Sequence, residues 1–285
     1  MRLAVIEGRA SLLIDGTIVD VERASVGRFS TVVDELYRDW SSFMQWSTDV
    51  AAGDRLESEL RSAQWGALAR APRQIFAVGL NYVDHAAESG FTVPEHPMVF
   101  TKFASSIAGP FEPLKLPSDN VDWEVELVAV VGHGGRNIAE TDGLGAIAGF
   151  CIGQDYSARD VQMRGVPPQF SLGKSFAGFA PLGPVFVDTA TFLQQSDVTL
   201  DCWIDDAIVQ SASMKDMVFS VPRLVSELSS IVDLLPGDLI FTGTPPGVGF
   251  GQQPPRYLRA GEVVRSTISG LGTMSQECVA HRDAS

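Results

Sequence analysis

The sequence is poor in cysteine, in basic residues and in long apolar runs. Its three cysteines, Cys151, Cys202 and Cys278, follow no CxxC spacing, which argues against a disulfide framework and against a thiolate zinc site. Lysine and arginine number 21 against 35 acidic residues, a net charge of −14 that argues against a nucleic-acid partner, because phosphate binding needs basic patches. The apolar runs are too short to span a bilayer.

Several catalytic and nucleotide-binding motifs are also missing. The chain has no GxSxG nucleophile elbow, no Walker A loop, no GxGxxG after a strand, and no His-rich or Cys-rich metal motif. The N-terminal MRLAVIEGR carries acid and base too early for a signal peptide. We therefore expect a soluble, cytoplasmic protein that partners neither nucleic acid nor membrane.

The 285 residues divide into two regions that differ in their residue patterns. Residues 1–24 are expected to form a hairpin or meander with a turn at Asp15-Gly16, and apolar residues recur at helical spacing from Thr31 to Trp46. After a soft boundary near residue 70, short β-rich runs alternate with Gly/Pro turns. We therefore predict a small N-terminal α/β domain over residues 1–70 and a catalytic domain over residues 71–285.

Helices are few in the second region, so the predicted fold class is mainly β with α (α+β), a folded-over sheet or roll rather than a Rossmann fold. The clearest helix is expected from Pro222 to Leu235, with Pro236-Gly237 as its stop. A second helix is expected to begin at Ser157, where SARD resembles a capping box.

The stretch DWEVELVAVVG, residues 122–132, has the pattern of a buried strand that carries two acids. Residues two apart in a strand point to the same face, so Glu124 and Glu126 aim the same way out of an apolar element. Two like charges in a low-dielectric place cost free energy unless something compensates them. A hard cation such as Mg²⁺, Mn²⁺ or Ca²⁺ would do so; the alternative is a solvated strand face.

Other polar residues are candidates for the same site. Asp155 ends another apolar strand, either as a third metal ligand or as a helix-capping aspartate. In NYVDHAAESG, a helix would bring His85 and Glu88 to one face, where the glutamate could orient the imidazole as a base; the alternative is an exposed pair. Lys174, in a Gly-flanked turn, and Thr244, in TGTPPG, are candidates for binding an anion; the alternatives are a solvated lysine and a plain turn at the end of a strand.

Four pieces occur in order along the chain: VGLNYVDHAAE, DWEVELVAVVG, QDYSARDVQ with LGKSF, and GDLIFTGTPPGVG. As an ordered set they resemble the fumarylacetoacetate hydrolase family, from about residue 70 almost to the C-terminus. The later segment PPRYLRAGEVV…ISGLGT is also similar to bacterial members that cleave 2,4-diketo acids. Leu80 departs from the family pattern, because some members carry arginine there.

The resemblance implies a mixed β-sandwich roll with the active site at its mouth, in a homodimer. It implies a divalent metal, typically Mg²⁺, held by Glu124, Glu126 and Asp155. The implied partner is a small 2-oxo acid substrate.

The resemblance also assigns roles to residues around the metal. It implies a dyad that activates water, an anion-binding lysine, two substrate contacts from the SARDVQ motif and a carboxylate-binding threonine. The dyad is His85 with Glu88, and the lysine is Lys174. The substrate contacts are Arg159 and Gln162, and the threonine is Thr244.

In the chemistry that the resemblance implies, the metal stabilises a pyruvate-type enolate as a C–C bond breaks. We predict first the hydrolysis of an acylpyruvate or 2,4-diketo acid. Second come an oxaloacetate decarboxylase and a 2-hydroxyhepta-2,4-diene-1,7-dioate isomerase on the same site. Two alternatives from other classes are a β domain with a structural ion and a binding protein for small keto acids. Turnover separates these classes, while affinity alone does not.

Overall fold

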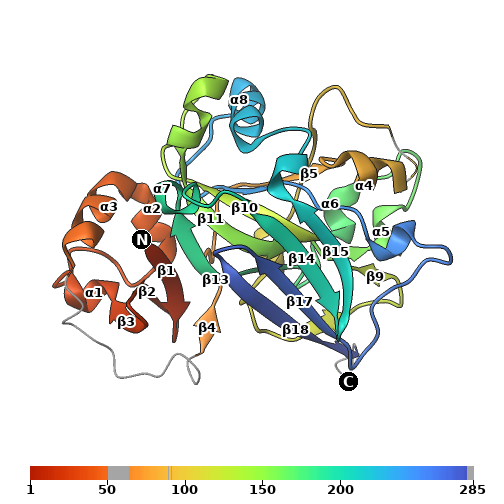
Figure 1. Ribbon diagram of the computed structural model, residues 1–285, viewed down its shortest axis with the longest axis horizontal. Helices are drawn as coiled ribbons and strands as arrows, with labels where there is room; N and C mark the ends of the chain where they lie inside the picture. Colours follow the sequence, from red (N-terminus) through yellow and green to blue (C-terminus); the bar gives the residue numbers. More distant parts are fainter. Residues whose placement is uncertain (51–63, 89, 91, 281–285) are drawn as a thin grey trace.

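The computed structural model describes residues 1–50, 64–88, 90 and 92–280, and most of its strands form two sheets (Figure 1). In this described part, the larger sheet has eleven strands: β1 (Arg2–Ile6), β2 (Arg9–Ile14), β3 (Thr17–Asp20), β4 (Trp65–Gly66), β5 (Ile75–Gly79), β6 (Met98–Thr101), β7 (Ile107–Ala108), β10 (Val125–Val131), β11 (Ile147–Gln154), β13 (Ala180–Asp188) and β16 (Leu239–Phe241). Their order is β3-β2-β1-β13-β11-β10-β16-β5-β6, with β4 on β1 and β7 on β13.

The second sheet packs on the first through contacts of β10 with β14 and of β11 with β17. Its order is β15-β14-β17-β18-β8, and β9 pairs with β12 separately. The bounds of these strands are β8 (Leu114–Leu116), β9 (Val121–Asp122), β12 (Ser157–Ala158), β14 (Thr199–Ile204), β15 (Ala207–Ser213), β17 (Val263–Ile268) and β18 (Gly272–Ala280). The predicted class, mainly β with α, is confirmed.

The helices lie around the sheets: α1–α3 at the left of Figure 1, and α4, α5 and α6 together at its right. Their bounds are α1 (Val21–Ala24), α2 (Val33–Arg38), α3 (Trp40–Asp49), α4 (Val83–Glu88), α5 (Arg159–Gln162), α6 (Phe170–Gly173), α7 (Thr189–Phe192) and α8 (Val221–Ile231), with 3-10 turns η1 (Ala104–Ser106), η2 (Glu140–Ala146), η3 (Met214–Asp216) and η4 (Gly249–Gly251). Across the described residues, none of these helices has the length and apolar character needed to cross a bilayer.

Strand β10 alternates between two buried cores. Its odd-numbered residues Val125, Leu127 and Ala129 pack between the two sheets, while Val128 and Val130 face the core that the N-terminal helices cover. Because side chains alternate along a strand, Glu124 and Glu126 fall on the same face as Val128 and Val130, at the end of that row. At the start of β10, an interior strand of the sheet, the acids therefore take the place of apolar core residues.

The N-terminal expectations are borne out with one refinement. The hairpin joins β2 to β3 around Asp15 and Gly16, whose positive φ angles of 48° and 77° suit a two-residue turn. The helical segment from Thr31 to Trp46 is two helices rather than one, because Asp39 adopts φ −130° and ψ 56° between α2 and α3.

Two helix predictions were wrong in part. Helix α8 ends at Ile231 instead of Leu235, because Val232 is extended and Leu234 forms a bridge with Gly135. Ser157 does not cap a helix: it lies in β12, and its hydroxyl donates to the Asp155 carbonyl at 3.0 Å. Helix α5 begins two residues later, at Arg159.

Candidate functional site

Three carboxylates converge where β10 and β11 lie side by side. Glu124 directly precedes β10, Glu126 is its second residue, and Asp155 follows the end of β11. The Asp155 amide donates to the Glu124 carbonyl at 2.9 Å, which holds the two chain segments together. One oxygen from each carboxylate lies within 4.8 Å of the others, and all three residues are buried. The structure thus brings the predicted metal ligands together.

Three cations lie against this triad. Lys174 Nζ is 2.6 Å from Glu124 Oε2 and 2.6 Å from Asp155 Oδ2. Lys102 Nζ is 2.5 Å from Asp155 Oδ1 and also donates to the carbonyl of Lys174. Arg159 Nη2 is 2.8 Å from Glu124 Oε1. Lys174 was predicted as an anion-binding group, and its nearest anions are the protein's own carboxylates.

The three cations compensate the carboxylates unequally. Burial acts to raise the pKa of Glu124, but Lys174 and Arg159 outweigh it and hold that pKa at about 2. Glu126 accepts from the Gly243 amide at 2.8 Å and has no ion-pair partner in the described chain. Burial, together with the charges of Asp155 and Glu124, raises the pKa of Glu126 well above its usual range. Glu126 is therefore the acid of the triad whose negative charge the protein compensates least.

The donor set fits a hard divalent cation. Carboxylate oxygens are the ligands that Mg²⁺, Mn²⁺ and Ca²⁺ prefer. Each carboxylate offers about four lone-pair positions, so acceptor capacity remains beside the lysine and arginine contacts. A cation held by Glu124, Glu126 and Asp155 would also supply the charge that Glu126 needs.

The predicted His–Glu pair forms on helix α4. His85 Nδ1 lies 2.9 Å from Glu88 Oε1, which agrees with their i, i+3 spacing on one helical face. Glu88 also accepts from the amides of Gly247 at 2.9 Å and Val248 at 3.4 Å. With the Nδ1 hydrogen donated to Glu88, the other ring nitrogen, Nε2, is an acceptor.

Thr244 and Gln210 form a second fixed pair. The Thr244 hydroxyl donates to the Val125 carbonyl at 2.9 Å and accepts from Gln210 Nε2 at 2.8 Å. Gln210 is 1% exposed and lies on β15, so the second sheet sets the position of this threonine. The role of Thr244 in carboxylate binding stays a prediction.

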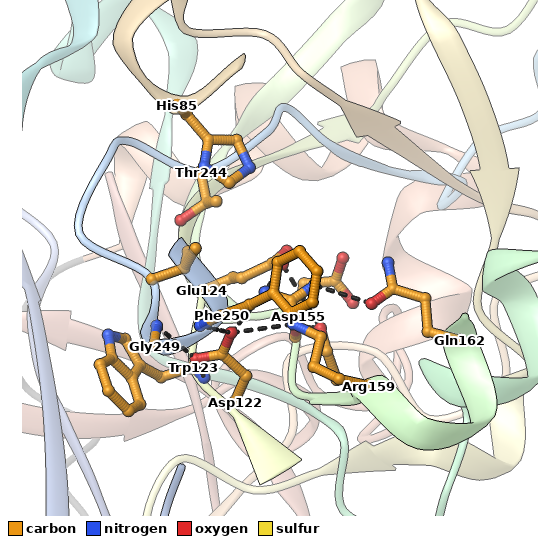
Figure 2. Close-up of polar contacts among 12 residues, drawn as sticks. His85, Asp122, Trp123, Glu124, Asp155, Arg159, Gln162, Thr244, Gly249 and Phe250 are labelled. Atoms are coloured by element: carbon orange, nitrogen blue, oxygen red, sulfur yellow. Dashed lines mark hydrogen bonds and ion pairs between the residues drawn. The ribbon is translucent and has the colours of Figure 1, made fainter. Parts of the chain in front are cut away.

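Arg159 and Gln162 are joined at the other side of the triad (Figure 2). Arg159 Nη1 donates to Gln162 Oε1 at 2.7 Å, and Nε and Nη2 donate to Asp122 Oδ2 at 2.8 and 2.6 Å. Most of the guanidinium is therefore engaged by protein groups. Substrate contact by Arg159 and Gln162 stays a prediction.

All but two of the nine predicted site residues line one small cavity of about 40 Å³. Asp155 and Glu88 stand behind it, in contact with Lys174 and His85. Apolar side chains complete the wall: Val78, Leu80, Met98, Phe100, Met163, Phe170 and Phe250. A larger hollow of about 870 Å³ is lined by residues 116–119 and 254–260 with Ala280, and it contains none of the predicted site residues.

Three polar residues of this site were missed from the sequence: Lys102, Asp122 and Gln210. A lone lysine after MVFT and a glutamine in an alternating strand carry no local signal of a site. Asp122 stands inside the motif that drew attention, yet its partners lie in segments distant from it along the chain. Only the tertiary fold relates these residues to the triad.

Comparison with known proteins gives consistent relatives. Residues 74–279 match the family model described as fumarylacetoacetate (FAA) hydrolase C-terminal. The mitochondrial oxaloacetate tautomerase fahd2 of Xenopus laevis is 43% identical over 210 residues, which cover 73% of this chain and 66% of that protein. The chain thus spans about two thirds of the length of this curated relative. A cytoplasmic location, a homodimer and a domain boundary near residue 70 stay predictions.

Solved structures agree in fold. A Mycobacterium smegmatis protein provisionally called HpcE superposes with a TM-score of 0.94 at 46% identity, covering 99% of this chain and 100% of that chain. The fumarylpyruvate hydrolase of Pseudomonas aeruginosa, solved with Mn²⁺ and pyruvate, has a TM-score of 0.67 at 31% identity, covering 76% and 92%. Together with the match over residues 74–279, these likenesses show that the chain belongs to the fumarylacetoacetate (FAA) hydrolase family.

Proposed function

We propose that this protein is a divalent-metal-dependent enzyme that hydrolyses a C–C bond in an acylpyruvate or another 2,4-diketo acid. The main support is that His85, Lys174 and the carboxylates of Glu124 and Glu126 line one cavity, with Lys174 paired to Glu124 and to Asp155 behind it. Such a site suits a substrate that develops negative charge on oxygen. The Pseudomonas aeruginosa relative was solved with pyruvate, the product that this reaction would release. We expect Mg²⁺ as the cation, with Mn²⁺ as the alternative.

When bound, the cation would supply Lewis-acid stabilisation of negative charge on the substrate's oxygens. The chain's own groups would handle the proton and the orientation. His85 Nε2 would take a proton from water while Glu88 stabilises the imidazolium through Nδ1. The Lys174 ammonium has three donors, of which two go to Glu124 and Asp155, so the third can reach a substrate oxygen.

The bond changes then balance without a further reactant. Hydroxide attacks the C4 carbonyl, and the C3–C4 bond breaks with its electron pair moving to C3 and the C2 oxygen. C3 takes up a proton, which gives pyruvate and a carboxylic acid. Water is the co-substrate, and the proton that His85 removed is available for return.

A second candidate is keto–enol tautomerisation of oxaloacetate, which the 43% identity to the Xenopus laevis tautomerase supports. This reaction moves a proton between C3 and the C2 oxygen and needs no attack by water. Decarboxylation of oxaloacetate and the isomerase reaction would use the same developing charge. All of these start from a 2-oxo acid in the same place.

Turnover of a substrate panel tests the proposal. The panel contains acetylpyruvate, a longer acylpyruvate, a 2,4-diketo-3-deoxy sugar acid and oxaloacetate, each with Mg²⁺, with Mn²⁺ and with EDTA. Pyruvate is followed by a coupled assay and the oxaloacetate enol by its ultraviolet absorbance. We expect pyruvate release from a diketo acid that EDTA abolishes. Faster enol decay without pyruvate would favour the tautomerase. Tight metal binding without any turnover would favour a structural ion.

A further inference from the structure

Asp122 is a fully buried carboxylate next to the site, and the chemistry proposed above gives it no role. It ends β9, two residues before Glu124, and is 0% exposed. Figure 2 shows it between Gly249 on one side and Arg159 on the other. Its Oδ1 accepts from the amides of Trp123 at 2.9 Å and Gly249 at 2.7 Å. Its Oδ2 accepts from the Phe250 amide at 2.9 Å and from Arg159 twice.

Through Arg159, Asp122 acts on the triad and on the cavity wall. The edge of the guanidinium formed by Nε and Nη2 is bound to Asp122, and the remaining donors reach Glu124 at 2.8 Å and Gln162 at 2.7 Å. The backbone amide of Phe250 donates to Asp122, and the centre of the Phe250 ring lies 5.5 Å from Arg159 Cζ. Asp122 therefore contacts the guanidinium directly and also holds the backbone of Phe250, whose ring lies beside it.

Asp122 also anchors one end of the loop Gly243–Phe250. Amides of this loop hold three acids from three different elements: Gly243 binds Glu126, Gly247 binds Glu88, and Gly249 with Phe250 binds Asp122. The amide donors to Glu88 lie between the other two anchors. Displacement of the Asp122 anchor would therefore disturb the support of Glu88, which orients His85.

We propose that Asp122 is a positioning residue that sets both the Arg159 guanidinium and the Gly243–Phe250 loop with one carboxylate. The proposal rests on the proposed function only for the substrate assayed. The role requires a carboxylate, because both oxygens of Asp122 act only as acceptors in its five hydrogen bonds. An amide of the same shape would turn an NH₂ group toward at least one of those donors.

The variant Asp122→Asn should therefore retain the fold and lose kcat/KM. We expect a fall of about 10- to 100-fold, through a lower kcat and a higher KM, as for other groups that orient ligands from behind. Asp20→Asn is a matched control: Asp20 is 1% exposed and also binds an arginine and a backbone amide, those of Arg9 and Arg23, on β3. We expect this control to stay within about twofold of wild type.

Two readouts separate positioning from a general structural effect. Because Asp122 acts partly through Arg159 and partly through the loop, the double variant Asp122→Asn with Arg159→Gln should lose more kcat/KM than Arg159→Gln alone but clearly less than the two single losses combined. Strictly additive losses would overturn the proposal. Asp122→Glu keeps the charge and acceptors but moves them by one methylene, so it should also lose activity. Wild-type kcat/KM in Asp122→Glu would refute the positioning role, and this variant serves if Asp122→Asn does not fold.

Hydrogen exchange tests the loop without any substrate. Asp122→Asn should speed amide exchange in peptides that cover Gly247 to Phe250 and in α4, while Asp20→Asn should speed it only near β3. Unchanged exchange over Gly247 to Phe250 would overturn the proposal. Because this readout needs no turnover, failure of the proposed function in the substrate panel and failure of the Asp122 proposal give different results.

Discussion

Glu124 and Glu126 are two residues apart and have opposite electrostatic surroundings. Lys174 and Arg159 face Glu124, and its pKa stays at about 2 in spite of burial. Glu126 accepts a hydrogen bond from the Gly243 amide and has no ion pair in the described residues. Burial and the neighbouring acids raise its pKa well above its usual range. Basic side chains thus compensate the negative charge of Glu124 well and that of Glu126 poorly. A bound cation would act mainly by compensating Glu126.

His85 is the residue on which hydrolysis should depend most. His85→Ala should lower kcat for pyruvate release by about 100-fold or more, the scale of general-base catalysis. Mn²⁺ affinity, measured by titration, should remain, because His85 contacts Glu88 and not the triad. His133→Ala is the control, since His133 is exposed and touches Ser41. Retention of hydrolysis by His85→Ala would remove this residue from the mechanism.

Residues whose signal is local could be predicted from the sequence. Glu124 and Glu126 were predicted because acids two apart stand out in an apolar strand, and His85 with Glu88 because residues three apart share one helical face. Asp155 was only a candidate from its own strand, and the family resemblance assigned it to the triad. Lys102 was not predicted, because its partner Asp155 is brought to it by the pairing of strands far apart in sequence. The sequence therefore placed all three acids of the triad in the site but missed one of the three cations beside them, Lys102.

At the scale of elements, the loop Gly243–Phe250 connects Glu126, Glu88 and Asp122 through its backbone amides. Its glycines allow backbone positions that a side chain would prevent: Gly247 has φ +106°, and a Cβ there would lie 1.9 Å from the Val209 carbonyl oxygen. The amide of Gly247 is at the same time the donor to Glu88. Gly247 therefore both packs closely against β15 and supports the His85–Glu88 pair.

Gly247→Ala tests this position. The methyl group would push the loop away from Val209, so kcat/KM should fall about 10-fold or more, because small misplacements of catalytic groups are costly. Gly261→Ala is the matched control, since Gly261 has φ +93° and open space around its Cβ position. It should cost about 1 kcal/mol in the free energy of unfolding, for the left-handed φ alone, and leave kcat/KM unchanged. Equal effects of the two substitutions would show that strain, not displacement, is responsible.

Helix ends were the least predictable elements. Apolar periodicity continued to Leu235, but the bridge between Leu234 and Gly135 draws the chain into an extended form after Ile231. At Ser157 the local capping signal was overridden by pairing of β12 with β9. In both cases a tertiary contact with a distant segment outweighed the local preference. The prediction that each segment contains a helix was correct, because helix formation depends on periodicity, which is local.

For the whole molecule, the N-terminal region and the rest of the described chain share one sheet. Strand β1 pairs with β13, and the core under α2 and α3 contains Tyr37 and Phe43 together with Val128 and Cys151 of β10 and β11. The predicted division into residues 1–70 and 71–285 stays a prediction about folding units. A shared sheet and core favour one cooperative unit, since neither side of that core is complete without the other.

Calorimetry decides between one and two units. We expect a single thermal transition whose calorimetric and van't Hoff enthalpies agree. Phe43→Leu removes part of a fully buried ring in the N-terminal region and should cost about 1–2 kcal/mol. If the core is shared, this substitution lowers the midpoint of the whole transition, by about 2–4 °C for each kcal/mol. Two transitions, of which Phe43→Leu moves only one, would instead support separate domains. The triad at the ends of β10 and β11 would then stay folded when the N-terminal region unfolds.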